Sequence, residues 1–382
     1  MTTTLQDVGA VTASPPDSVS PLLRKHMPEL DVLRGVAVLM VVVYHGLYWS
    51  GAVSSNRIGT LIIKASVIGW LGVNLFFVLS GFLISGILLD TKGRQSYYRR
   101  FYRRRVVRIL PAYFLTIAIL IVLHSLTLGS TIVALLFLTN YSIFPVVGGY
   151  GPFWSLSVEE QFYLFWPMLV AKVSVRGLTI LSVGLCLVEP LLRWLSSSGH
   201  LPLGDVHAST YLIADNLALG TLAAIFVRSR YGSLRNGLRL GSAMILAGMT
   251  ILIIGIPFGI LHRSSGFGSA LQTTPWNIIF AGTVLTLLSL QSPLFSGIWT
   301  APLRFLGYIS YGLYLYHLII FSAIYDRLVR HISNPALRMN LQGYFTRLVL
   351  AGSIAIFASW ISRRFFEDYF LRLKVGSHTE KT

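Results

Sequence analysis

The stretch LDVLRGVAVLMVVVYHGLYW, residues 30–49, decides how the chain folds. It is apolar enough, and at about 20 residues long enough, to cross a bilayer as a helix. It nevertheless contains Asp31, Arg34 and His45, and ionisable side chains inside such a helix are costly. The stretch therefore predicts a membrane-spanning helix whose ionisable residues have a functional or structural role inside the bilayer.

Arg34 and His45 lie eleven positions apart. At about 100° per residue they return to nearly the same helix face, about 16 Å apart along the axis. Histidine gains and loses a proton near neutral pH, so His45 fits an intramembrane general base. The other interpretation is a histidine bonded to a neighbouring helix as a packing contact. This helix alone leaves both interpretations open.

The composition is that of a polytopic membrane protein. Mean hydropathy is +0.68, 12% of the 382 residues are charged, and apolar runs recur along the whole chain, which excludes a soluble domain. The net charge of +17 comes from short Lys and Arg clusters between apolar runs. Such clusters are typical of topology signals and argue against nucleic-acid binding. The single cysteine, Cys186, lies within an apolar run, so neither a disulfide framework nor a metal site is expected.

We expect an all-α polytopic membrane protein with about ten transmembrane helices. A short apolar segment at residues 131–144 is too short to cross and is expected to be re-entrant or interfacial. The expected spans are residues 30–49, 68–90, 106–128, 154–173, 176–195, 210–229, 239–260, 275–291, 303–330 and 342–372.

Lys and Arg alternate between rich and poor loops. Residues 24–25 and 92–105 are basic, whereas residues 127–154 contain neither Lys nor Arg. By the positive-inside rule this pattern predicts that both termini are cytoplasmic. The basic loop from Arg327 to Arg338 is the exception, because it should lie outside.

The same pattern predicts the domain organisation. Residues 1–28 are rich in Ser, Thr, Pro and Asp and are expected to form a disordered cytoplasmic tail. Residues 29–373 are expected to form one transmembrane domain, and residues 374–382 a cytoplasmic C-terminal tail.

Ser80 and Gly81 belong to a small-residue face in the second span. Such a face allows close approach either of another helix or of an extended ligand. In the basic segment that follows, Arg105 and Arg108 lie one turn apart, and Pro111 is expected to break the helix beyond them. Two parallel guanidinium groups suit phosphates, either of lipid headgroups or of a phosphorylated donor.

Glu159 and Glu160 enter the outer head of the fourth span. Adjacent residues on a helix point about 100° apart, so we expect at most one of them to face a given cavity.

Six blocks, in this order, resemble the acyltransferase 3 family of integral-membrane O-acyltransferases, the OafA/YrhL-like bacterial enzymes. The blocks are LDVLRGVAVLMVVVYH, FFVLSGFLIS, RRRVVRILPAY, FWSLSVEEQFYLFWP, ADNLALG and LGYISYGLYLYH. The resemblance implies a bundle of about ten helices in the bacterial cytoplasmic membrane. Such a bundle moves an acyl group, usually acetyl from cytoplasmic acetyl-CoA, to a hydroxyl of a carbohydrate or other acceptor.

The resemblance also implies roles for individual residues. The family's Arg and His eleven positions apart match Arg34 and His45, its paired-arginine motif matches Arg105 and Arg108, and its acidic residue after WSL matches Glu159. We therefore expect His45 to be the base, with Arg34 on the same face opposing its protonation. The arginine pair would hold CoA phosphates, Ser80 and Gly81 would let the pantetheine arm pass, and Glu159 would orient the acceptor hydroxyl or His45.

The expected partners are an acyl-CoA co-substrate, a hydroxyl acceptor and the lipid bilayer, with no nucleic acid and no permanently bound cofactor. Acceptor identity, acyl length and oligomeric state are not encoded in a readable motif. The alternative is a transporter or flippase of an anionic or glycan substrate, since intramembrane charges and a basic cytoplasmic gate suit that task too. Against it, the two halves of the chain show no inverted repeat.

Overall fold

The computed structural model describes residues 20–49, 51–52, 54, 56–141, 149–201, 203–261, 266–328 and 341–372. Every regular element within these ranges is a helix, which confirms the all-α class. The longer helices are α1 (Pro28–Val43), α2 (Arg57–Ser66), α3 (Leu71–Thr91), α4 (Tyr97–Val122), α5 (Leu128–Leu135), α6 (Phe153–Lys172), α7 (Val175–Ser197), α9 (Asp215–Arg228), α10 (Leu234–Gly255), α12 (Thr273–Leu290), α13 (Ala301–Leu318) and α16 (Leu341–Ile361). The shorter ones include α8 (Thr210–Ile213), α11 (Gly266–Leu271), α17 (Asp368–Arg372) and the π-helical turns η1 (Tyr44–Tyr48), η6 (Ile319–Tyr325) and η7 (Ser362–Glu367).

The expected spans all correspond to helices. Within the described ranges, 8 helical stretches are long and apolar enough to cross a membrane, the longest being the 35 residues from α2 through α3. Two expected spans are helical but fall outside that set. These are α6, which carries the adjacent glutamates, and the span at 210–229, which breaks at Ala214 into α8 and the 14-residue α9. The short segment expected near 131–144 begins as α5, which has 8 residues; residues 142–148 lie outside the described part.

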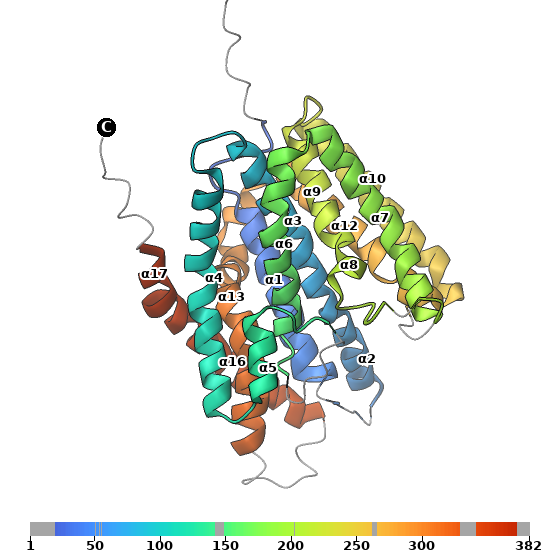
Figure 1. The fold of residues 1–382 in the computed structure, drawn as a ribbon. Helices are drawn as coiled ribbons and strands as arrows, with labels where there is room; N and C mark the ends of the chain where they lie inside the picture. Colours follow the sequence, from blue (N-terminus) through green and yellow to red (C-terminus); the bar gives the residue numbers. More distant parts are fainter. Residues whose placement is uncertain are drawn as a thin grey trace, which may run out of the picture.

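The helices form two groups that meet along α3 and α9 (Figure 1). One group contains α1, α4, α6, α13 and α16, and the other contains α7, α10 and α12. Glycines bring α1 and α13 into direct backbone contact. A Cβ atom at Gly35 would lie 1.9 Å from the carbonyl oxygen of Leu303, and one at Gly307 would lie 2.1 Å from that of Asp31. No larger side chain fits at this crossing.

A buried ion cluster ties α7 to α9. The Arg193 guanidinium lies 3.9 Å from Glu189 and 2.9 Å from Asp215, and all three side chains are at most 1% exposed. The Asp215 N–H also donates to the Glu189 carboxylate at 2.7 Å. Glu189 and Arg193 lie four positions apart in α7, the spacing of a salt bridge within a helix. Asp215 of α9 is a second acidic partner of Arg193.

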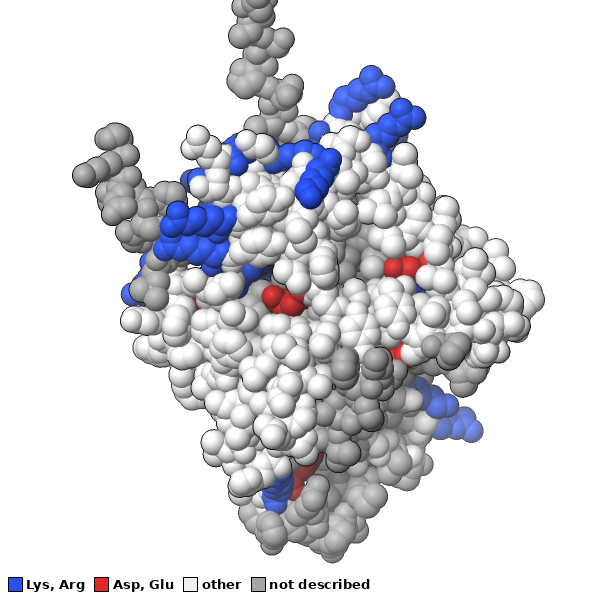
Figure 2. Space-filling model, in the orientation of Figure 1, with Lys and Arg blue, Asp and Glu red and all other residues white. Residues whose placement is uncertain are grey.

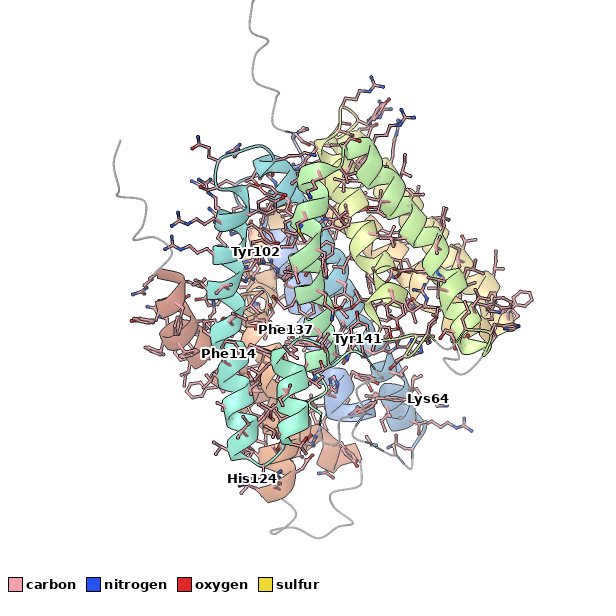
Figure 3. All side chains as sticks on the ribbon, in the orientation of Figure 1. Lys64, Tyr102, Phe114, His124, Phe137 and Tyr141 are labelled. Atoms are coloured by element: carbon pink, nitrogen blue, oxygen red, sulfur yellow. The ribbon has the colours of Figure 1, made fainter. Side chains whose placement is uncertain are left out.

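Basic side chains gather at one end of the molecule, where α3 turns into α4 and α6 into α7 (Figure 2). Helix α4 runs from that end, near Tyr102, to the opposite end at His124, and Lys64 also lies toward that opposite end (Figure 3). The cluster of residues 92–105 thus lies at one face of the bundle, as the charge pattern predicts.

The chain ends differ in part from expectation. Residues 1–19 of the expected N-terminal tail lie outside the described residues, but from Ser20 onward the chain packs against the bundle. Leu22 is fully buried and the Gln291 amide donates to the Pro21 carbonyl at 2.7 Å, so the packed domain begins before residue 29. Arg330, Arg338 and the tail at 374–382 lie outside the described residues.

Candidate functional site

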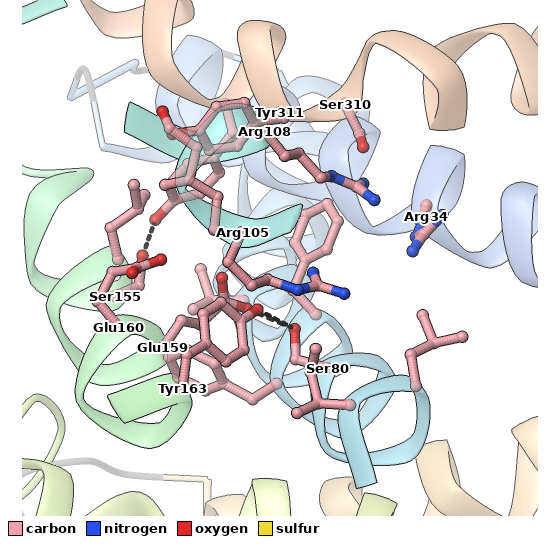
Figure 4. Close-up of a pocket in the computed structure, with 18 of the residues that line it drawn as sticks. Arg34, Ser80, Arg105, Arg108, Ser155, Glu159, Glu160, Tyr163, Ser310 and Tyr311 are labelled. Atoms are coloured by element: carbon pink, nitrogen blue, oxygen red, sulfur yellow. Dashed lines mark hydrogen bonds between the residues drawn. The ribbon is translucent and has the colours of Figure 1, made fainter. Parts of the chain in front are cut away.

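A cavity of about 180 Å³ lies between α1, α3, α4, α6 and α13, and we name it the arginine cavity (Figure 4). Figure 4 shows the guanidinium groups of Arg34, Arg105 and Arg108 directed into the same open space. Its polar lining consists of these arginines with Ser80, Ser155, Glu159, Glu160, Tyr163, Ser310, Tyr311 and Tyr314. Five of the predicted site residues, from four different helices, therefore meet in one cavity: Arg34, Ser80, Arg105, Arg108 and Glu159.

The arginines are held in different ways. The Arg105 guanidinium carbon lies 5.4 Å from the Tyr163 ring centre and 5.8 Å from that of Phe101, which fixes its plane. Its buried Nε has no hydrogen-bond partner among the described residues. The Arg34 guanidinium lies 3.5 Å from the Asp31 carboxylate. The Arg108 side chain lines the same cavity and is exposed. The cavity therefore offers positive charge with donors to spare.

Two expectations about α4 and α6 are wrong. Pro111 lies inside α4, which continues to Val122, because a membrane helix tolerates proline where its neighbours re-satisfy the freed backbone groups. Glu159 and Glu160 both line the arginine cavity, because the cavity extends around α6 by more than the angle between them.

Glu159 does not orient His45. Its carboxylate accepts a hydrogen bond from Ser80 Oγ at 2.7 Å, and the Tyr163 hydroxyl reaches the same Ser80 oxygen at 3.4 Å. Glu159 lines the arginine cavity and not the cavity that holds His45. The structure thus links Ser80 to Glu159, a pairing that the sequence did not predict.

Gly81 serves helix packing. A Cβ atom at Gly81 would lie 2.1 Å from the carbonyl oxygen of Leu217 in α9. Gly81 is buried in that crossing and does not line the arginine cavity. Of the two alternatives for the small-residue face, Ser80 lines the cavity and Gly81 belongs to the helix contact. The passage of a ligand arm past these two residues stays a prediction.

His45 lines a second, larger cavity of about 990 Å³, which we name the histidine cavity. Much of its lining is aromatic or amide in character, including Trp49, Asn74, Asn140, Tyr150, Trp154 and Asn216. Asp205, His207 and Arg327 also line this cavity. Rings, amides and a few charged groups together suit a hydroxyl-rich molecule, which can stack on the rings and hydrogen-bond to the polar groups.

The backbone around His45 is held by an ion pair. Here α1 widens into the π-helical turn η1, a feature often found at functional sites. The Arg347 guanidinium donates to the carbonyls of His45 at 3.3 Å and Gly46 at 3.4 Å. Arg347 is itself paired with both oxygens of Asp326 at 2.8 and 2.9 Å. Helix α16 thus anchors the turn that carries His45.

The His45 ring contacts His317 of α13, with 3.2 Å between His45 Nδ1 and His317 Nε2. Sequence reasoning did not include His317 among the site residues. The signal was present, because Tyr311, Tyr314 and His317 recur at every third position. That stripe proves to be both hydrogen-bonded contact and cavity lining: Tyr311 donates to the Ile109 carbonyl at 2.8 Å, and Tyr314 bonds to Ser155.

The two cavities share a wall. Val73, Phe77 and Tyr314 line both of them, and the hydrogen bond between the Tyr314 and Ser155 hydroxyls holds the tyrosine in place. Arg34 and His45 therefore lie on one helix but face different cavities, which the eleven-residue spacing alone does not reveal. A space lined by three arginines and a space lined by the His45 imidazole therefore meet at one layer of side chains.

Comparison with known proteins gives a consistent picture. Residues 27–364 match the model of a family described as an acyltransferase domain. The chain is 29% identical over 380 residues to the putative peptidoglycan O-acetyltransferase YrhL of Bacillus subtilis, covering 90% of this chain and 54% of the relative. It is 29% identical over 384 residues to the peptidoglycan O-acetyltransferase OatA of Listeria monocytogenes, covering 92% and 58%. The chain thus spans just over half the length of these relatives. No solved structure matches.

Proposed function

The chain belongs to the acyltransferase family whose model covers residues 27–364, and from that premise we propose that it is a membrane O-acyltransferase with a two-sided active site. In this proposal an acyl thioester, acetyl-CoA in the simplest case, binds at the arginine cavity. A hydroxyl of a cell-envelope carbohydrate binds at the histidine cavity, and the acyl group is transferred across the shared wall.

The arginine cavity supports the donor half of the proposal. Forked guanidinium groups bind phosphate oxygens in pairs, and Arg105 and Arg108 lie one turn apart on α4. Arg105 also keeps a buried Nε without a partner among the described residues, a donor that a phosphate oxygen would satisfy. Since basic residues gather at this end of the bundle, we propose that it faces the cytoplasm, where CoA thioesters are made.

The histidine cavity supports the acceptor half. Its aromatic and amide lining suits a sugar, and the relatives that the chain resembles are named for O-acetylation of peptidoglycan. We propose a glycan hydroxyl, with a peptidoglycan sugar as the first acceptor to test.

His45 is the proposed general base. Its Nε2 would take the proton from the acceptor hydroxyl as the hydroxyl oxygen attacks the thioester carbonyl. Collapse of the tetrahedral intermediate would break the carbon–sulfur bond, and the leaving thiolate would take from the His45 imidazolium the proton that came from the acceptor hydroxyl. The products are then an acyl ester and free CoA thiol, and His45 returns to its neutral form.

One observation carries the proposal: the arginines and the histidine line adjoining cavities with a common wall of Val73, Phe77 and Tyr314. The test is purified protein in nanodiscs with acetyl-labelled acetyl-CoA and a soluble peptidoglycan fragment. We expect free CoA and label on a sugar hydroxyl in equal amounts. Intact acetyl-CoA, together with movement of glycan or CoA across sealed vesicles, would favour a transporter instead.

A further inference from the structure

We propose that His317 is the positioning residue for His45, holding its ring so that the unprotonated Nε2 faces the histidine cavity. This inference rests on the proposed role of His45 as general base. It assigns a function to a buried side chain of α13 that ends the last of the six blocks quoted above and is not among the site residues expected from the sequence.

The first step is the proton on His317. Its Nδ1 lies 3.1 Å from the Leu313 carbonyl oxygen and 2.8 Å from the Tyr314 carbonyl oxygen. A carbonyl oxygen only accepts hydrogen bonds, so Nδ1 must carry the proton. In a neutral ring the other nitrogen, Nε2, is then an acceptor.

The second step is the proton on His45. Its Nδ1 lies 2.9 Å from the Val41 carbonyl oxygen and 3.2 Å from His317 Nε2. Both neighbours are acceptors, so the proton of a neutral His45 belongs on Nδ1, where it is shared between them. His45 Nε2 is then left with a free electron pair. That is the tautomer that a general base needs, provided that Nε2 faces the substrate.

His317 cannot be the base itself. It is fully buried and lines neither cavity, whereas His45 lines the histidine cavity. The two rings come from adjacent helices, since α1 and α13 pack against each other. His317 therefore acts through His45 and touches no substrate.

The contact becomes stronger during the reaction. When His45 takes a proton on Nε2, its Nδ1–H belongs to an imidazolium, and a hydrogen bond from a charged donor is about twice as strong as a neutral one. The bond also holds the ring against rotation. A half-turn would direct a ring carbon at Val41 and His317 and would lose both bonds, and the 990 Å³ cavity beside the ring leaves room for other orientations.

The kinetic test compares His317→Leu with His317→Gln. Leucine removes the acceptor, and we expect kcat to fall about 10- to 100-fold with both KM values within about twofold of the parent protein. Glutamine places its amide oxygen near the position of Nε2 and should restore kcat to within about threefold. His200→Leu and His200→Gln, in the exposed loop after α7, are the matched controls and should leave kcat unchanged. An unchanged kcat in His317→Leu, or equal losses in the two His317 variants, would overturn the proposal.

A spectroscopic test does not require turnover. With ¹⁵N-labelled histidine, the parent protein should show a protonated Nδ1 and an unprotonated Nε2 for His45, with a scalar coupling between His45 Nδ1 and His317 Nε2 across the hydrogen bond. Absence of that coupling overturns the proposal. Because the measurement uses the parent protein, it tests the proposal even when His317→Leu does not fold. If the coupling is present but acetyl-CoA is never consumed, the proposed function fails while the ring contact stands.

Discussion

The arginine cavity and the histidine cavity are built from some of the same helices yet offer opposite chemistry. The smaller cavity of 180 Å³ is surrounded by three guanidinium groups and two carboxyl groups. The larger one of 990 Å³ is lined mostly by rings, amides and hydroxyls, with the imidazoles of His45 and His207 and the charged side chains of Asp205 and Arg327. Clustered guanidinium groups suit a ligand with phosphates, and a roomy, mostly uncharged surface suits a polyol. If the proposed function holds, binding of the donor and activation of the acceptor belong to separate spaces, which predicts that they fail separately on mutation.

The largest effect is expected from loss of His45 in the histidine cavity. His45→Ala should lower kcat by about 10² to 10⁴, the usual cost of losing a general base, while donor KM changes little. His200→Ala, at an exposed histidine that lines neither cavity, is the control and should retain most activity. Steady-state release of free CoA measures both, and a His45→Ala protein with near-normal kcat would mean that chemistry occurs elsewhere.

The next effect belongs to the arginine cavity. Arg105→Ala should raise the KM for acetyl-CoA about 10- to 100-fold and lower kcat less, because charge-assisted bonds to the phosphates are lost. Arg104→Ala is the matched control, since the neighbouring arginine is exposed and does not line the cavity. If donor KM stays the same and acceptor KM rises instead, the two cavities have been assigned the wrong way round.

A smaller effect tests acceptor binding. Trp49 lines the histidine cavity and is 66% exposed, and its ring centre lies 6.3 Å from that of His45, so Trp49→Ala removes an aromatic surface beside the proposed base. Losing one aromatic surface should raise acceptor KM about 3- to 10-fold and leave donor KM unchanged. Trp299, which is 87% exposed and lines neither cavity, provides the control Trp299→Ala.

The smallest effect concerns the shared wall. Tyr314→Phe keeps the ring but removes the bond to Ser155, so we expect kcat to change by less than about fivefold. The sensitive readout is CoA released without acceptor, which should rise because a less constrained ring lets water from the histidine cavity reach the thioester. If Tyr314→Phe shows unchanged release, the hydrogen bond does not hold the wall in place.

Much of this site could be predicted from the sequence. The arginine pair, Arg34, Ser80 and Glu159 do line one cavity, because intramembrane charges are costly and survive only where they face a cavity or a partner. The sequence also identified His45 as one of two things, a base or a helix contact. The structure gives it both a contact, with His317, and a cavity face.

The remainder depends on how the helices are rotated and packed. Helix α3 is apolar on all sides, so no periodic pattern shows that Ser80 faces the cavity while Gly81 faces Leu217. Likewise, the positions of Arg34 and His45 in one helix cannot reveal that a wall from α3 and α13 separates them. The side chains of that wall come from distant parts of the sequence, since Phe77 and Tyr314 are about 240 residues apart.

The glycines that bring α1 against α13 also matter for the energised membrane. Two hollows that hold water, one open toward each leaflet, would leave most of the transmembrane voltage to fall over the few side chains between them. Phe77 and Tyr314 lie in that layer, and the glycine crossing packs α1 against α13 in the same bundle. If the chain transfers an acyl group as proposed, these few side chains would bear the membrane field while the group passes from one cavity to the other.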